Sequence, residues 1–243
     1  MNYSIIKDEM KLDEFLNILP DNNEDEAYYL CLFGRHKYCL AFPNTKDSGQ
    51  LARIAARKKD LKEKIRRLET PLGSYTRDGI IAPQEALAVY IGLNPRSYAK
   101  ANKAMLITLA ERFASGDTNF NPITLATTEL HRATNRKFFV DFDFDDANPL
   151  CYLSEIRSHL PDDAFRILCT RGGFHVIVEL SKTPKTSWWK EIAALPKCDV
   201  KGSNNLTPVP GCTQGDFTPC FLTFSPHLIV PPHLQGTHLP SAI

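Results

Sequence analysis

Two aspartates alternate with aromatic residues in the segment FFVDFDF at residues 138–144. Successive side chains of a strand point to opposite faces, so Asp141 and Asp143 would share one face and the apolar side chains the other. Carboxylates about 6.5 to 7 Å apart along a strand can bridge hard divalent cations, which prefer oxygen ligands and phosphates. Two such metals support phosphoryl or nucleotidyl transfer. The segment therefore predicts a two-metal site for Mg²⁺ or Mn²⁺.

A histidine in a second apolar segment has the same phase. In FHVIVEL, residues 174–180, the alternating apolar side chains would face the core and place His175 on the opposite side. A lone histidine usually fills a core or surface position. If the two strands are neighbours, however, His175 meets Asp141 and Asp143, and the shared phase favours a functional role.

A tight turn, Arg171-Gly172-Gly173, comes directly before this second segment. Glycine permits a close approach of the backbone to a ligand or to another strand. Arginine is a natural ligand of phosphate, because its guanidinium donates two parallel hydrogen bonds. The turn is therefore a candidate for phosphate contacts.

The segments around these residues alternate in type. They are predicted as a strand, a helix, two strands and a helix, at Lys137–Phe144, Leu150–Leu160, Phe165–Cys169, Phe174–Leu180 and Thr186–Leu195. A closing strand is predicted at Cys198–Val200 or at Cys220–Phe224. This order is that of ferredoxin-like (βαββαβ) and RNA-recognition folds, in which the first and third strands are neighbours. The expected fold class is α+β, with helices on one face of the sheet and the carboxylates on the other, open face.

Residues 1–130 are predicted to form an N-terminal helical or α/β module, and residues 131–243 the sheet domain, in one intimate core. Within the module we expect a hairpin at Tyr28–Phe33 and Tyr38–Phe42, a helix over Gly49–Leu68, a strand at Ala86–Leu93, and a helix from an N-cap at Ser97 to Ser115. The helix at Gly49–Leu68 is rich in Lys and Arg. These cations either form a solvated face or contact a nucleic-acid backbone.

The 243 residues include 29 Lys and Arg against 28 Asp and Glu, a net charge of +1. This balance excludes binding of nucleic acid through bulk charge, although a local basic patch is compatible with it. No apolar run approaches the roughly 20 residues that a bilayer needs, and the first residues include acids where a signal peptide has basic and apolar residues. Seven cysteines without a CxxC pair indicate reduced thiols and no zinc site. We expect a cytoplasmic protein without membrane contact.

Three motifs in order resemble those of the archaeo-eukaryotic primase superfamily, the primase-polymerases. The first motif, an apolar strand ending in Asp-x-Asp, is matched by Val140-Asp141-Phe142-Asp143. The second, a small residue followed by any residue and His, is matched by Gly173-Phe174-His175. The third, an apolar residue and a carboxylate, is matched by Cys198-Asp199. The segment at 209–215, VPGCTQG, is similar to the Pro-Gly-Thr segment that follows in many members, with Cys212 interrupting it.

The resemblance implies an RRM-like catalytic palm and a template-directed nucleotidyltransferase, a DNA primase or DNA polymerase of replication. Its two metals, Mg²⁺ or Mn²⁺, would be bound by the catalytic Asp141, Asp143 and Asp199, with Asp216 as a rival third acid. His175 would contact the nucleotide, and the other expected nucleotide ligands are Arg171, Gly173 and Lys201. Lys201 is equally well interpreted as a solvated loop lysine.

The partners implied are single-stranded DNA template, a primer, and a dNTP or an NTP. Cations would have to line the groove for the nucleic acid. The candidates are Arg53–Arg67, Arg96, Lys100, Lys103, Arg132, Arg136 and Lys137.

Two other functions remain open. The first is another metal-dependent nucleotide enzyme, such as a cyclase or a phosphodiesterase, which would not depend on a template. The second is a non-catalytic, RRM-like module that binds nucleic acid by stacking bases on aromatic side chains. Acids in the middle of a strand argue against this second alternative, because they repel phosphates unless metals intervene.

Overall fold

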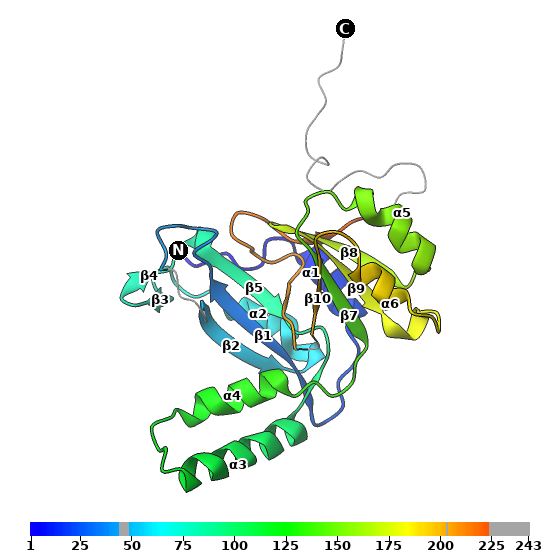
Figure 1. Ribbon diagram of the computed structural model, residues 1–243. Helices are drawn as coiled ribbons and strands as arrows, with labels where there is room; N and C mark the ends of the chain where they lie inside the picture. Colours follow the sequence, from blue (N-terminus) through cyan, green and yellow to red (C-terminus); the bar gives the residue numbers. More distant parts are fainter. Residues whose placement is uncertain (44–48, 203, 224–243) are drawn as a thin grey trace.

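A computed structural model describes residues 1–43, 49–202 and 204–223 of the chain. These residues form a mixed α+β structure with antiparallel sheets and six α-helices (Figure 1). Two five-stranded sheets lie side by side, and the second has two helices on its outer face (Figure 1). None of the helices in the described ranges is long and apolar enough to cross a membrane.

The first sheet is built mainly from the N-terminal half, in the order β11-β5-β1-β2, with β6 pairing with the beginning of β1. Its strands are β1 (Glu26–Gly34), β2 (Gln50–Ala56), β5 (Leu87–Ile91), β6 (Arg96–Ser97) and β11 (Thr207–Pro208). β1 is buried along its whole length, because β5 and β2 pair with its edges and its side chains pack into a hydrophobic cluster on each face of the sheet. β11 comes from the C-terminal half, so the chain returns to this sheet before it adds β12, the last strand of the second sheet.

Two predictions for this half are wrong. The helix expected over Gly49–Leu68 is replaced by strand β2, a 3₁₀ turn η1 (Lys58–Asp60) and a short helix α2 (Leu61–Arg66). The strand expected at Tyr38–Phe42 consists of turns, in which the N–H groups of Tyr38 and Phe42 bond to carbonyls three residues earlier. β2 therefore takes the place beside β1 that the predicted hairpin assigned to residues 38–42.

The helices of this half lie on both faces of the first sheet. They are α1 (Glu9–Ile18), α3 (Tyr98–Ala114) and α4 (Pro122–Arg132), in addition to α2. Helices α1 and α2 bury apolar side chains in a core with β1 and β5. Helices α3 and α4 pack against each other and extend away from the sheets (Figure 1). Ser97 caps α3 as predicted, since its side chain accepts a hydrogen bond from the N–H of Lys100. Short elements complete this half: β3 (Thr76–Arg77), β4 (Ile80–Ile81) and the 3₁₀ turn η2 (Gln84–Ala86).

The second sheet has the strand order β10-β7-β9-β8-β12, and all neighbours are antiparallel. Along the chain its elements are β7 (Phe139–Phe144), α5 (Leu150–His159), β8 (Phe165–Thr170), β9 (Gly173–Glu179), the 3₁₀ turn η3 (Leu180–Lys182), α6 (Trp188–Ala193), β10 (Cys198–Lys201) and β12 (Cys220–Phe221). Both segments considered for the closing strand are therefore strands, at opposite edges. Residue 224, the end of the predicted range Cys220–Phe224, lies outside the described residues.

The phase predicted for β7 and β9 is observed. Phe142, Phe144 and Phe174 lie in a core with α5 and α6, and the rings of Phe144 and Phe174 stack with their centroids 4.6 Å apart. The opposite face, expected to be open, is partly covered. Leu168 and Ile177 lie on that face and pack into the core that contains α1 and the first sheet. The carboxylates and the histidine therefore lie where the two sheets meet.

Candidate functional site

Asp141, Asp143 and His175 converge at the junction of the two sheets. Asp143 lies directly opposite His175 in the antiparallel pairing of β7 and β9. The His175 Nδ1 is 2.9 Å from Asp141 Oδ1, and its Nε2 is 3.5 Å from Asp143 Oδ1. Asp141 is 5% exposed and His175 6%, so both side chains are almost completely removed from water. The imidazole is thus held between two carboxylates.

Asp141 is surrounded by hydrogen-bond donors. Besides His175, the Thr207 hydroxyl donates to Asp141 Oδ2 at 2.8 Å and the Asn205 amide donates to the same oxygen at 3.0 Å. Thr207 belongs to β11, so a strand of the first sheet fixes a carboxylate of the second. Such bonds to a buried charged group are strong, and they fix the orientation of the Asp141 carboxylate and, through it, of the His175 ring.

Asp143 and Asp199 face each other across β7 and β10. Lys201, two residues after Asp199 on the same face of β10, has its Nζ 3.3 Å from Asp143 Oδ2 and forms an ion pair with Asp199. Burial tends to lower the pKa of Lys201, but the two carboxylates outweigh burial and raise it. A cation therefore lies between two carboxylates, and Asp199 remains well exposed at 69% of its side chain.

The same neighbours shift the pKa of His175. Burial alone lowers its pKa, whereas the charge of Asp141, the hydrogen bond to it and the charge of Asp143 raise the pKa, and the net shift is upward.

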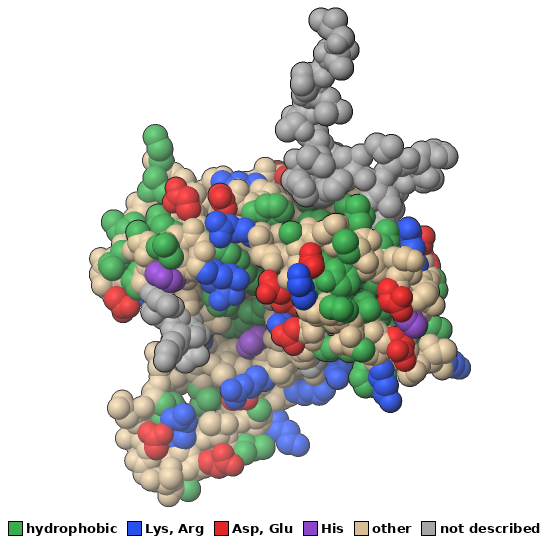
Figure 2. Space-filling view, turned by 45° about the horizontal axis from the view of Figure 1, so that its top comes forward, with side chains coloured by type: hydrophobic (Ala, Val, Ile, Leu, Met, Phe, Trp, Pro, Cys, Tyr) green, Lys and Arg blue, Asp and Glu red, His purple; other side chains and the backbone are tan. Residues whose placement is uncertain are grey.

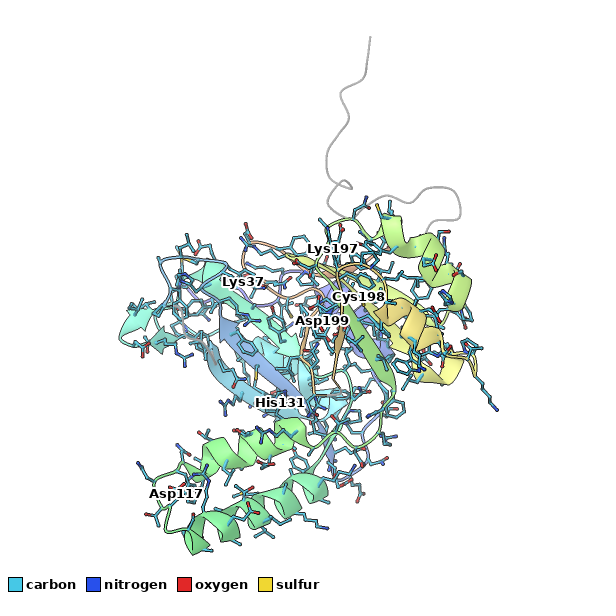
Figure 3. The ribbon with its side chains drawn as sticks, in the orientation of Figure 1. Lys37, Asp117, His131, Lys197, Cys198 and Asp199 are labelled. Atoms are coloured by element: carbon cyan, nitrogen blue, oxygen red, sulfur yellow. The ribbon has the colours of Figure 1, made fainter. Side chains whose placement is uncertain are left out.

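A cavity of about 510 Å³ opens beside these residues, between the two sheets. Asp143, His175, Asp199 and Lys201 line it, as do Thr170 and Gly172 at the turn between β8 and β9. Figure 3 shows Asp199 and Lys197 near β10, with Lys37 across from them toward the first sheet. Figure 2 shows acidic and basic side chains gathered around the hollow in the middle of this face.

Three further cations line the cavity that the sequence motifs did not indicate: Arg35 and Lys37 toward the first sheet, and Lys197 beside β10. Arg35 follows β1; its guanidinium lies 4.9 Å from the ring centroid of Phe33 and 5.2 Å from that of Tyr90, and its buried Nε has no hydrogen-bond partner in the described structure. Lys197 is paired with Asp146. The only sequence signal for Arg35 and Lys37 is their place in a loop after a buried strand.

Arg171 does not contribute to the wall of this cavity. Its Nε donates to Asp216 at 2.6 Å, and its guanidinium lies over the ring of Tyr38. Asp216, the rival of Asp199 as third acid, is therefore occupied by Arg171, while Asp199 is the acid opposite Asp143. The pKa of Asp216 is lowered by the Arg171 hydrogen bond and charge.

Gly173 has a structural reason to be small. A Cβ at this position would lie 2.1 Å from the carbonyl oxygen of Phe144 on the neighbouring strand. Its neighbour Gly172, not Gly173, lines the cavity, and a Cβ there would meet nothing within 4 Å. The small residue before His175 therefore lets β9 approach β7 closely and brings His175 beside the aspartates.

The cations expected to line a nucleic-acid groove are dispersed. Arg96 is fully buried, and Arg136 pairs with the buried Glu26 at 2.6 Å. Arg53 donates to Thr127 of α4. The cations of α2 mostly pair with acids of α1 or α2. Four of the expected cations are exposed in the first turns of α3, at the end of α4 and just before β7: Lys100, Lys103, Arg132 and Lys137.

The site contains carboxylate oxygens, the ligands that a divalent cation requires, but these oxygens do not surround a single position. Among the described residues, no group of three or more His, Cys, Asp or Glu side chains is arranged to hold a metal ion. Asp143 and Asp199 supply hard oxygen ligands, and the Lys201 ammonium between them marks a position that favours positive charge. These two acids would have to exchange the Lys201 ammonium for a metal ion, and Asp145 is the third carboxylate that lines the same cavity. All seven cysteines are free.

Comparisons of this chain with protein-family models, with curated proteins and with solved structures found no match.

Proposed function

We propose that this chain is a template-directed nucleotidyltransferase, a DNA primase or polymerase that makes or extends primers from dNTPs or NTPs. The observation that supports this most is the cavity between the sheets, with Asp143, Asp199 and His175 on one wall and Arg35 and Lys37 on the other. Carboxylates bind the metal of a metal–nucleotide complex, and clustered cations bind its phosphates. A triphosphate lying between the two walls meets both requirements.

The connectivity of the second sheet supports a further part of the proposal, an RRM-like palm. Its elements follow each other as strand, helix, two strands, helix and strand, and β10, β7, β9 and β8 are neighbours in that order. This is the arrangement of the split βαβ unit of ferredoxin-like folds. The three segments that resemble motifs of archaeo-eukaryotic primases lie on β7, β9 and β10, and their Asp141, Asp143, His175 and Asp199 share one face of that sheet.

In the proposed reaction a 3′-hydroxyl oxygen forms a bond to the α-phosphorus of the nucleotide, and the bond from this phosphorus to the bridging oxygen breaks. The products are a phosphodiester and pyrophosphate, and the hydroxyl proton is released. Divalent cations bound by Asp143 and Asp199 would supply charge stabilisation and an activated hydroxyl. Asp141 orients His175, whose Nε2 faces Asp143 and the cavity, so that the ring can donate to a phosphate oxygen. Arg35 and Lys37 would neutralise the remaining phosphate charge.

A base-stacking module without activity is less well supported. Such a module exposes aromatic side chains on its sheet. Here Phe142, Phe144 and Phe174 are buried against the helices, and the cavity side of β7 and β9 holds acids and a histidine.

The direct test is incorporation of labelled dNTPs and NTPs on primed and unprimed single-stranded DNA, with Mn²⁺ and Mg²⁺ compared. We expect product whose sequence follows the template, and its loss in Asp143→Asn. Glu191→Gln, which changes an exposed acid of α6, is the matched control and should keep full activity. Product that ignores the template would favour another nucleotide enzyme. Nucleic-acid binding without synthesis by the unchanged chain would contradict the proposal.

A further inference from the structure

Helix α3 has an apolar face that the rest of the described chain leaves uncovered. The hairpin of α3 and α4 extends away from the sheets (Figure 1), and α3 packs on α4 through its other face. That inner face holds the buried Ala101 and the half-buried Ala104, Met105, Thr108 and Arg112. The exposed face carries mainly apolar side chains: Ala99, Leu106, Ile107, Ala110, Phe113 and Ala114.

This exposure is unusual for a surface helix, which normally places polar and charged side chains toward water. Leu106 is 67% exposed, Ile107 50% and Phe113 60%. A contiguous apolar patch on the surface marks a site of interaction more often than scattered apolar residues do. The face therefore suits another apolar surface.

Two charges on this face lie symmetrically about Ile107. Lys103 comes four residues before Ile107 and Glu111 four residues after it, so each lies about 6 Å from Ile107 along the helix. The three side chains form one row on the helix surface. Lys103 and Glu111 are both exposed, and neither has an ion-pair partner among the described residues. The row thus has a cation at one end and an anion at the other.

We propose that α3 packs antiparallel against α3 of a second copy of this chain, about a two-fold axis beside Ile107. Such an axis places Lys103 of each copy opposite Glu111 of the other, so both ion pairs form together. Rows spaced by four residues are the ridges that interdigitate in the commonest class of helix packing. A parallel arrangement would instead place lysine against lysine and glutamate against glutamate. The charges of α3 therefore complement those of an antiparallel copy.

The proposed interface is small. One helix of 17 residues on each side covers less than the roughly 1,200 to 2,000 Å² that stable protein interfaces bury. We therefore expect a reversible dimer with a Kd in the micromolar range. This dimer does not depend on the proposed function and would form whether or not the chain makes nucleic acid.

Sedimentation velocity of the whole chain over a range of micromolar concentrations tests the dimer. Ile107→Glu sets two acids against each other at the axis and should raise the Kd about 100-fold or more. Ile81→Glu on β4 is the matched control, because Ile81 is 57% exposed, and it should dimerise like the unchanged chain. Circular dichroism and the melting temperature check that both variants fold.

Charge reversal tests the antiparallel arrangement. Lys103→Glu and Glu111→Lys should each raise the Kd about fivefold or more, because each turns two attractions per dimer into repulsions. The double variant exchanges the two charges and should return the Kd to within about twofold of the unchanged chain. High salt should reduce the effect of both single reversals.

Three results would overturn the inference. They are an unchanged chain that stays monomeric at every concentration, an Ile107→Glu variant that dimerises normally, and a double charge variant that recovers no affinity. Anisotropy with labelled single-stranded DNA identifies a different occupant. A monomeric unchanged chain whose DNA binding is weakened by Lys103→Glu would assign the face to nucleic acid and refute the dimer.

Discussion

Replacing Thr207 with valine tests how the first sheet fixes Asp141. The Thr207 side chain is fully buried, and its hydroxyl donates to Asp141 Oδ2 at 2.8 Å. Valine keeps the shape of threonine but has no donor, so the substitution removes one hydrogen bond without opening a cavity. Hydrogen bonds to charged groups contribute about 1.5 to 3 kcal/mol. We expect a loss of about 2 kcal/mol in the free energy of unfolding, which lowers Tm by roughly 4 to 8 °C in a chain of this length.

The assay is urea unfolding followed by circular dichroism, with Thr213→Val as the control. Thr213 is equally buried, but its hydroxyl donates to a neutral carbonyl, that of Gly215. Loss of the Thr213 hydrogen bond should cost about 1 kcal/mol of free energy of unfolding. Thr207→Ser keeps the donor and should therefore retain most of the stability that Thr207→Val loses. In a double-mutant cycle, Thr207→Val should lower the free energy of unfolding less in the Asp141→Asn variant than in the unchanged chain. Equal costs for Thr207→Val and Thr213→Val, and no coupling to Asp141, would refute the reasoning.

Two further predictions concern stability. Burial raises the pKa of Glu26, but Arg136 and the N–H donors around the carboxylate outweigh burial and lower it to about 2 from 4.5. Because the pKa of Glu26 is lower in the folded than in the unfolded chain, Glu26 stabilises the fold above about pH 4.5, and this contribution is lost as the pH falls toward 2. The difference in free energy of unfolding between the unchanged chain and Glu26→Gln should therefore shrink over that range. A difference that stays constant with pH would contradict the assignment. Gly173→Ala should destabilise by about 1 to 3 kcal/mol, because its methyl group meets the carbonyl oxygen of Phe144, whereas Gly172→Ala should be nearly neutral in the same unfolding assay.

The sequence predicts β7 and β9, the strands that carry Asp141, Asp143 and His175, but leaves the closing strand open between β10 and β12. In β7 and β9 the side chains alternate between the two faces of the sheet, so the local sequence determines which of them share a face, independently of tertiary contacts. Pairing of the two strands then brings Asp143 opposite His175, as the predicted strand order required. Motif order alone favours Asp199 over Asp216, and Asp199 pairs with Asp143 across β10 and β7.

What could not be predicted depends on packing between distant segments. Leu51, Ile54 and Ala55 fit a helical period, but β1 needs a partner at its free edge, and this pairing makes the segment a strand. Arg35 and Lys37 meet the acids only because the two sheets pack together. No local pattern encodes that contact.

The proposed pairing of Asp143 and Asp199 around a metal–triphosphate is tested most directly by electron paramagnetic resonance of Mn²⁺. The titration is made with a nucleotide whose α,β bridge cannot be cleaved. We expect bound Mn²⁺ in the unchanged chain, strengthened by the nucleotide, and loss of this binding in both Asp143→Asn and Asp199→Asn, while Glu191→Gln binds normally. Mn²⁺ binding that is absent from the unchanged chain, or equal in all four proteins, would contradict the account.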